Sequence, residues 1–298
     1  MYYEHLENMQ HMNITLLSED NAFDYEDYLT ADVAENLSRD YYKGIVVEED
    51  EGDAPLAAMV FEIAGIEEQE TTEAVIHFLK IEYEEAAGLL FDSYKELIES
   101  YDVKKSTFMI SVSEEDDSIK EKKALADAGF TVRLTEGDEI ITDLKELLTL
   151  PIMKSRKVPD TIFSLNEMTT RGFRNAISKS VMSGRKGVCP DLALLPFSWF
   201  DSDVSCYSEH DGNVDGLLLF HKMPSGMIAI QLMVAMSGDA QKILLGMMRK
   251  FVISLEENYG PGTKVVLNRH NYSSLALTEK LLPGGFGIPV YKGSRQEQ

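Results

Sequence analysis

The 298-residue chain carries 51 Asp and Glu against 28 Lys and Arg, a formal net charge of −23 at pH 7. This length accommodates two domains, each with a core of its own. The acidic balance argues against nucleic acid as a partner, because phosphate recognition needs clustered Lys and Arg, and no apolar run approaches the ~18 residues of a membrane span.

The first half alternates strand and helix patterns. Ala87, Leu90, Tyr94 and Ile98 recur at helical spacing and predict an amphipathic helix over residues 84–101. Apolar alternation and turn residues predict strands at 13–17, 44–47, 55–63, 74–82, 106–112, 131–134 and 139–142, with further helices at 22–39 and 118–128.

The second half repeats this order. A basic segment between two prolines, residues 151–160, is interpreted as a linker. Beyond it we predict strands at 162–165, 204–208, 216–223, 227–234, 264–268 and 286–291, and helices at 169–183, 191–200, 239–257 and 273–282. Tyr101 corresponds to Tyr259, and Phe130 to Phe286, an offset of about 150 residues, which is the size of a domain. The sequence therefore predicts two copies of one α/β domain, residues 1–150 and 161–298.

The two halves differ in charge. Residues 1–150 hold 38 acidic and 11 basic side chains, a net charge of −27, and the remainder holds 13 and 17, a net charge of +4. Only the first half therefore repels polyanions at long range. Cys189 and Cys206 form neither a disulfide framework nor a zinc-type spacing, and the first residues lack the pattern of a signal peptide. We expect a cytoplasmic protein without a metal.

The order of predicted elements resembles the GNAT acyltransferase superfamily, once per half. The family's fourth-helix pattern, Asn-x-x-Ala-x-x-Leu-Tyr-x-Lys-x-Gly-Phe, is approximated by residues 271–280 followed by Gly285 and Phe286, whereas the first half keeps only residues 124–130. The resemblance implies an α/β (α+β) fold class with tandem domains. Each would be a mixed, mostly antiparallel sheet flanked by helices, with two splayed parallel strands at its centre.

The resemblance also implies acetyl-CoA or another acyl-CoA as donor substrate. Its pantetheine arm would lie along the fourth strand, and its pyrophosphate would bind N–H groups at the start of the next helix. In the second half the candidate binding residues are Gln231, Met233, Val234, Ser237, Gly238, Asp239 and Ala240, with Ser237 a candidate N-cap. In the first half the equivalent loop, residues 82–88, holds three glutamates, so we expect no CoA there.

Family members often use a fourth-helix tyrosine to protonate the leaving thiolate. Thr278 occupies that position here, and Tyr272 is the nearby phenol. His221, at a strand end, is a candidate base because histidine is the usual general base among side chains, and Asn268 ends the fifth strand beside the expected acyl group. His77 is a further candidate in the first half. Without the tyrosine we expect weak or absent turnover.

Three functions stay open from the sequence. The first is acyl-CoA-dependent transfer of an acetyl or other acyl group to a small-molecule or peptide amine, with the active site in the second half. The second is a non-catalytic tandem GNAT-fold protein that binds a ligand or partner. The third, transfer of an aminoacyl or other bulky acyl group, lacks the basic tract that tRNA recognition would need.

Overall fold

The computed structural model describes residues 12–29, 33–34, 37, 42–49, 55–66, 71–111, 119–184, 188, 190–193, 195–236, 239–269, 272–282 and 287–297. The chain divides into two units, which are described separately. Unit 1 comprises residues 1–136, 224–226 and 288–298, and unit 2 comprises residues 137–223 and 227–287.

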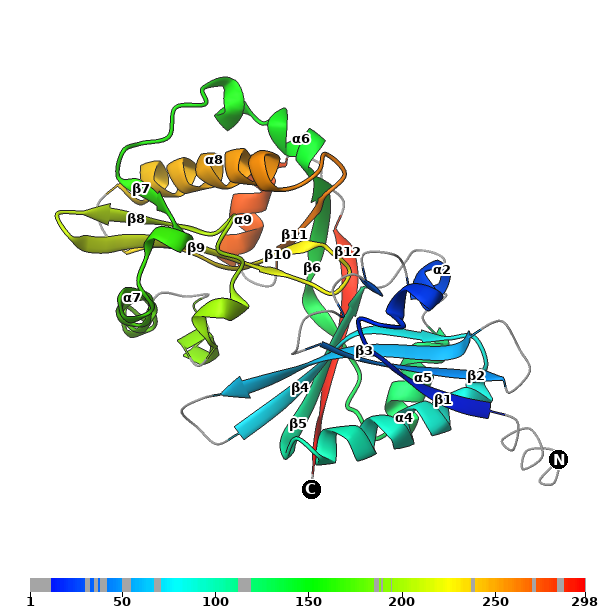
Figure 1. Cartoon of the computed structure of the whole chain (residues 1–298). Coiled ribbons are helices and arrows are strands. Elements are labelled where there is room, and N and C mark those ends of the chain that lie inside the picture. The colour runs from blue at the N-terminus through cyan, green and yellow to red at the C-terminus, as the bar shows by residue number, and fades with distance from the viewer. Residues whose placement is uncertain are drawn as a thin grey trace. The chain divides into compact units, whose positions relative to one another are not determined.

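Unit 1 is built on a sheet whose inner strands are buried on both faces (Figure 1). In sheet order the strands are β1 (Met12–Leu17), β2 (Tyr42–Glu49), β3 (Pro55–Ile66), β4 (Thr71–Ile81), β5 (Val103–Ser111) and β12 (Ile288–Gln296). Neighbours pair antiparallel except β4 and β5, which are parallel. Side chains alternate between the faces, so Ile45 and Val47 enter one core and Val46 the other.

Helices cover both faces of this sheet. The helix α4 (Glu84–Glu99) buries Ala86, Leu90 and Tyr94, spaced four residues apart, and packs beside α5 (Ile119–Asp127). The Tyr94 hydroxyl donates to Ser106 Oγ over 2.7 Å, and burial raises the pKa of this phenol. On the other face, η1 (Ala22–Tyr25) and α2 (Glu26–Leu29) stand where the sequence predicted the start of a helix over 22–39.

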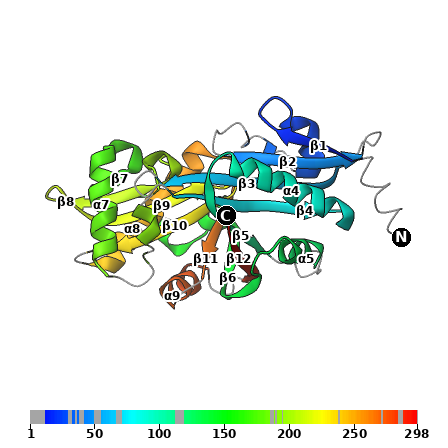
Figure 2. The same ribbon diagram turned by 90° about the horizontal axis from the view of Figure 1, so that it is seen from below.

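The strands of unit 2 also pair in a mixed arrangement and belong to the same 12-stranded sheet. Their order is β6 (Arg133–Asp143, which begins in unit 1), β11 (Lys264–Asn268), β10 (Ile228–Ala235), β9 (Asn213–Lys222), β8 (Cys206–His210) and β7 (Ile162–Ser164). The parallel pair is β10 and β11. The long helix α8 (Ala240–Asn258) covers one face, where Phe251 stacks on Phe220 with ring centroids 3.9 Å apart. The helix α7 (Thr170–Met182) covers the other face with Phe173 and Ile177 (Figure 2).

Shorter elements complete unit 2. They are α6 (Leu144–Leu148), η2 (Pro151–Lys154), η3 (Leu165–Glu167), η4 (Pro190–Ala193), η5 (Phe197–Trp199) and α9 (Tyr272–Leu281). The single helix predicted over 191–200 is wrong, because Pro196 separates the two 3-10 turns. The two short strands predicted around residues 136–138 are one strand, β6, since pairing overrides the local turn residues.

The closing strand of each half lies in the unit of the other half. β12 ends the chain but pairs with β5 of unit 1, from Val290 opposite Ser111 to Gln296 opposite Lys105. Residues 139–143 of β6 pair instead with β11 of unit 2. The compact units therefore differ from the sequence-based division into residues 1–150 and 161–298, which places each closing strand with its own half. Local pattern identifies a strand but not its partner.

Specific contacts hold β12 in unit 1. Gly293 passes so close to the chain that an added Cβ would lie 1.6 Å from the carbonyl oxygen of Thr131. Arg295 donates from one terminal nitrogen to the carbonyl of Ala128 over 2.8 Å and lies over the ring of Phe130, 4.8 Å from its centroid. A residue without a side chain and a cation at the end of α5 thus favour this pairing.

Candidate functional site

The strands β4 of unit 1 and β10 of unit 2 each carry a β-bulge. Between β3 and β4 the register shifts after Val60, which leaves His77 as the extra residue on β4. Between β9 and β10 it shifts after Ile230, which leaves Gln231 as the extra residue on β10. A bulge bends its strand and changes the direction of the backbone groups that follow.

Near each bulge the parallel ladder to the fifth strand ends. The register between β4 and β5 runs to Ile76 opposite Phe108. In unit 2 it holds only Ile228 opposite Val265 and Ala229 opposite Val266. The described pairs therefore stop where the bulge begins, and the backbone of residues 230–235 faces β11 without a ladder. This split is the splay that the sequence analysis expected between the central strands.

Asn268 reaches across the split of unit 2. Its Nδ2 donates to the carbonyl oxygen of Ile230 over 3.3 Å, and its side chain is half-buried. The structure thus brings Asn268 and the bulge together. The carbonyl of Ile230, at the entrance of the split, is therefore already hydrogen-bonded. A ligand that enters the split would have to displace or contact the Asn268 amide.

The start of α8 already holds an anionic group. Asp239 is its N-cap, with the carboxylate accepting from the N–H of Lys242 over 3.3 Å, and Ala240 is the first helical residue. The cap is therefore not Ser237, which lies with Gly238 outside the described residues. Aspartate is among the preferred N-cap residues because its carboxylate accepts from the free N–H groups of the first turn. It also places negative charge where a pyrophosphate would bind.

The other candidates on β10 offer backbone rather than side chains. The Gln231 amide turns back to the carbonyl of Ala229 at 3.5 Å. Met233 packs against the core beneath α8, and Val234 is buried in the core beneath α7. These three positions line the split only through their main-chain N–H and C=O groups.

Thr278, the candidate proton donor on the fourth helix, already uses its hydroxyl hydrogen within its own helix. Thr278 is 3% exposed, and its hydroxyl lies 2.9 Å from the carbonyl of Ser274 and 3.0 Å from that of Leu275. Its single hydrogen is therefore directed to its own helix, so Thr278 is not placed to protonate a thiolate. Tyr272 begins α9, but its side chain lies outside the described residues.

His221 is a packed histidine. It is 1% exposed, its Nδ1 lies 2.8 Å from the carbonyl oxygen of Trp199, and the two rings stack in parallel with centroids 3.7 Å apart. Trp199 belongs to the core beneath α7, whereas Leu282, which follows α9, belongs to the core beneath α8. His221 and the end of the fourth helix thus pack into different cores.

In unit 1 the bulge residue is half of a buried pair that the sequence analysis did not identify. His77 Nε2 lies 3.0 Å from Glu62 Oε2, and the two side chains are 13% and 2% exposed. The rings of Tyr42 and His77 are nearly perpendicular, with centroids 6.0 Å apart. The signal for Glu62 was its position, a carboxylate inside an otherwise apolar strand. The carboxylate of Glu62 thus fixes the orientation of the imidazole ring at the bulge.

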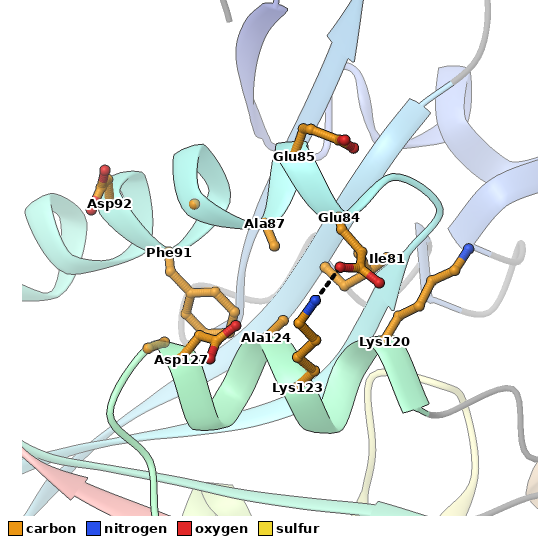
Figure 3. A pocket seen from close by; sticks show the side chains of 12 residues that line it. Ile81, Glu84, Glu85, Ala87, Phe91, Asp92, Lys120, Lys123, Ala124 and Asp127 are labelled. Atoms are coloured by element: carbon orange, nitrogen blue, oxygen red, sulfur yellow. Dashed lines mark hydrogen bonds and ion pairs between the residues drawn. The ribbon is translucent and has the colours of Figure 1, made fainter. Parts of the chain in front are cut away.

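A side chain of α5 reaches the end of β4, beside the split of unit 1. Glu121, 9% exposed, accepts the backbone N–H of Ile81 at the end of β4 through Oε1 over 2.9 Å. Tyr83 is the N-cap residue of α4, and its side chain makes no capping hydrogen bond. Glu84 in its first turn forms an ion pair with Lys123 of α5, which lowers the pKa of the carboxyl group (Figure 3).

Among the described residues, no three His, Cys, Asp or Glu side chains gather in a way that would hold a metal ion. Nor is any described helix long and apolar enough to cross a membrane.

No family model matches the sequence, and no curated protein is detectably similar to it in sequence. Solved structures do match. A tandem GNAT protein from the clavulanic acid biosynthesis pathway aligns over 96% of this chain and 99% of its own, with 12% identity and a TM-score of 0.58. A GCN5-related N-acetyltransferase from Sphaerobacter thermophilus covers 96% of each chain, with 10% identity and a TM-score of 0.57. A Drosophila protein covers 96% and 99%, with 11% identity and a TM-score of 0.55. These similarities confirm the fold class predicted from the sequence: the chain has the tandem GNAT fold.

Proposed function

We propose that unit 2 binds an acyl-CoA in its split and transfers the acyl group to an amine. The observation that carries this proposal is the combination of the bulge at Gln231 with the early end of the ladder at Ala229 and Val266. Together they leave the backbone groups of β10 that point towards β11 without a strand partner beyond Ala229. An amide-containing arm such as pantetheine can pair with such an edge as an additional strand would.

The charge of unit 2 supports this assignment. Unit 2 holds 16 acidic and 16 basic side chains, a net charge of zero that does not repel a polyanion, whereas unit 1 carries the entire net charge of −23. Lys179 of α7 donates to the carbonyl of Val214 over 3.0 Å, and the next carbonyl, that of Asp215, accepts the N–H of Met236. A cation therefore lies near the segment that joins β10 to α8.

The chemistry needs few side chains. A neutral amine attacks the thioester carbonyl, a C–N bond forms, and the C–S bond breaks as the thiolate leaves. Free N–H groups of β10 are suited to stabilise the oxyanion that develops on the carbonyl oxygen. The amine loses a proton to water or a base, and the thiolate takes one from solvent, since the hydroxyl of Thr278 is committed to its helix.

A second candidate function is binding without turnover. The observations that favour it are the engaged hydroxyl of Thr278 and the burial of His221, so neither of these two candidate groups is directed at the split. Both candidates share the same site and differ only in whether the thioester is cleaved.

The test is amide hydrogen exchange of the full chain with and without acetyl-CoA. We expect slower exchange over residues 230–236 and no change over residues 77–83. Asn268→Leu, which replaces the amide in the split by a branched apolar side chain, should abolish the protection. Asn213→Leu makes the same change on an exposed hairpin and should not. Protection on β4 instead, or on neither strand, would contradict the proposal.

Release of CoA thiol in the presence of small amines and peptide amines then separates the two candidates. Turnover that Asn268→Leu removes supports acyl transfer. Protection of β10 without thiol release supports the binding protein.

A further inference from the structure

The strand β11 is held differently by its two neighbours in the sheet, β10 and β6 (Figure 1). Its antiparallel ladder to β6 runs over its whole length and ends with Asn268 opposite Glu139. Its parallel ladder to β10 stops at Val266 among the described pairs. The end of β11 therefore stays with β6 where it leaves β10, and the split of unit 2 opens on the other side of it.

The attachment to β6 continues one residue beyond β11. The backbone N–H of Arg269 donates to the carbonyl oxygen of Asp138 over 2.8 Å. The guanidinium group of Arg269 also donates from Nε and Nη2 to the two carboxylate oxygens of Asp138. The two side chains are 13% and 31% exposed. A bidentate pair of this kind fixes geometry, and its partial burial limits screening by salt.

A glycine makes room for this pair. An added Cβ at Gly287 would overlap both the carboxylate of Asp138 and the guanidinium group of Arg269. The main chain at Gly287 thus passes directly against the ion pair, and only a residue without a side chain fits there. This close approach leaves the two charged groups little space in which to change their rotamers.

We propose that Asp138 and Arg269 form a clamp that holds the end of β11 on β6 and thereby positions Asn268 in the split of unit 2. Asn268 directly precedes Arg269 in the chain, and its Nδ2 reaches the carbonyl oxygen of Ile230 over 3.3 Å. That bond is long for an N–H···O bond, so it holds the amide less firmly than the clamp does. Asp138 and Arg269 act through Asn268 and are positioning residues. Their effect on acyl-CoA rests on the function proposed above, whereas their effect on Asn268 does not.

The first test needs no ligand. In the full chain labelled with ¹⁵N-asparagine, the side-chain amide signal of Asn268 is identified by its loss in Asn268→Leu. Arg269→Gln removes the fork of donors, and we expect the Asn268 amide protons to exchange with water about tenfold faster because the amide is no longer held at its acceptor. Arg269→Lys keeps the charge without the fork and should give a smaller increase. Glu256→Gln breaks an exposed ion pair with Arg156 elsewhere in unit 2 and should give none.

The second test is calorimetric titration of the same variants with acetyl-CoA. Arg269→Gln and Asp138→Asn should each weaken binding about tenfold, because a small displacement of a positioned group has a large effect. The double variant should be no weaker than either single variant, since both remove one contact. Asp138→Asn is decisive. If Arg269 only attracted the phosphates of CoA by its charge, loss of the neighbouring carboxylate would strengthen binding instead.

The outcomes separate the clamp from the acyl-CoA site. If wild type binds no acetyl-CoA, the proposed function fails, and the exchange rate of the Asn268 amide alone decides on the clamp. An unchanged exchange rate overturns the clamp, and so does an acetyl-CoA affinity that Asp138→Asn leaves unchanged or raises. Thermal unfolding establishes that each variant is folded. If Arg269→Gln fails to fold, Arg269→Lys takes its place, and a rate equal to that of Glu256→Gln overturns the proposal.

Discussion

The two units form the same split beside their parallel strands but place opposite hydrogen-bonding groups in it. In unit 1 the carboxylate of Glu121, from the helix after the fifth strand, accepts the backbone N–H of Ile81. In unit 2 the amide of Asn268, from the end of the fifth strand itself, donates to the carbonyl of Ile230. The fold provides the opening, and the side chains that enter it decide what ligand it accepts.

The helices that follow the fourth strands differ in the same sense. α4 begins without a side-chain cap and has Glu84 and Glu85 in its first turn. α8 begins under the carboxylate of Asp239 and has no further acidic residue in its first turn. Unit 1 thus combines an engaged N–H in its split with an acidic helix start. Unit 2 has one acidic group to overcome, and this difference makes it the better candidate for an anionic substrate.

The largest effect should come from removing β12. Deletion of residues 288–298 takes away the strand that pairs with β5 in unit 1. The loss of this ladder and of its buried Val290 should cost more than about 5 kcal/mol, comparable with the whole stability of a domain. We expect the amides of residues 105–111 to exchange freely, while those of β10 and β11 stay protected.

The opposite pattern of protection would show that β12 does not belong to unit 1. If the deletion exposed residues 264–268 and left β5 protected, β12 would belong with the second half, as the sequence order suggests. The experiment therefore separates the two assignments of the closing strand directly.

The substitution Gly293→Ala tests the pairing of β12 with β5 by adding a single methyl group. Gly293→Ala would place a Cβ 1.6 Å from the backbone oxygen of Thr131, and moving this residue would disturb the hydrogen bond from its N–H to the carbonyl of Ser294. We expect a loss of about 3 kcal/mol in the free energy of unfolding. Gly88→Ala is the matched control, because an added Cβ there meets nothing within 4 Å and α4 gains a better helix former. It should stabilise by about 0.5–1 kcal/mol in denaturant titration.

Much of this architecture could be predicted from periodicity. The four-residue spacing of Leu90, Tyr94 and Ile98 predicted α4, because burial of one helix face imposes that period, and the continuous apolar runs of β2 and β3 predicted strands buried on both faces. The partner of β12 could not be predicted, because no local pattern encodes which edge a strand joins. A close approach such as that of Gly293 is visible only in three dimensions.

For the candidate site too, the sequence predicted which element a residue lies on but not the contacts of its side chain. Sequence position placed Asn268 and Gln231 at the correct elements, since both follow from the order of strands. It could not show that Thr278 bonds to its own helix or that His221 stacks on Trp199, because both depend on rotamer and packing. Glu121 was missed because a Glu in a helix start is common and its burial has no sequence signature.

A charge-only change at α8 gives a smaller effect. Asp239→Asn keeps the cap, since Asn and Asp are equivalent there, but removes a negative charge from the start of the helix. If acyl-CoA binds in unit 2, its affinity should rise about fivefold, which corresponds to about 1 kcal/mol. Stability should change little. Glu85→Gln at the first turn of α4 is the control in unit 1, and calorimetric titration should show no effect of it on acetyl-CoA binding.

The smallest effect is expected at the position where the sequence pointed to a proton donor. Thr278→Val removes the hydroxyl but keeps the branched shape, and the two carbonyls that it contacts belong to the same helix. Because that hydrogen is directed to Ser274 and Leu275, its loss should leave any rate of CoA release within about twofold of wild type; loss of a general acid would lower it about a hundredfold or more. Steady-state thiol release in parallel for the two proteins makes the measurement. A hundredfold fall with unchanged acetyl-CoA affinity would mean that the hydroxyl turns towards the substrate during the reaction and would restore Thr278 as a catalytic residue.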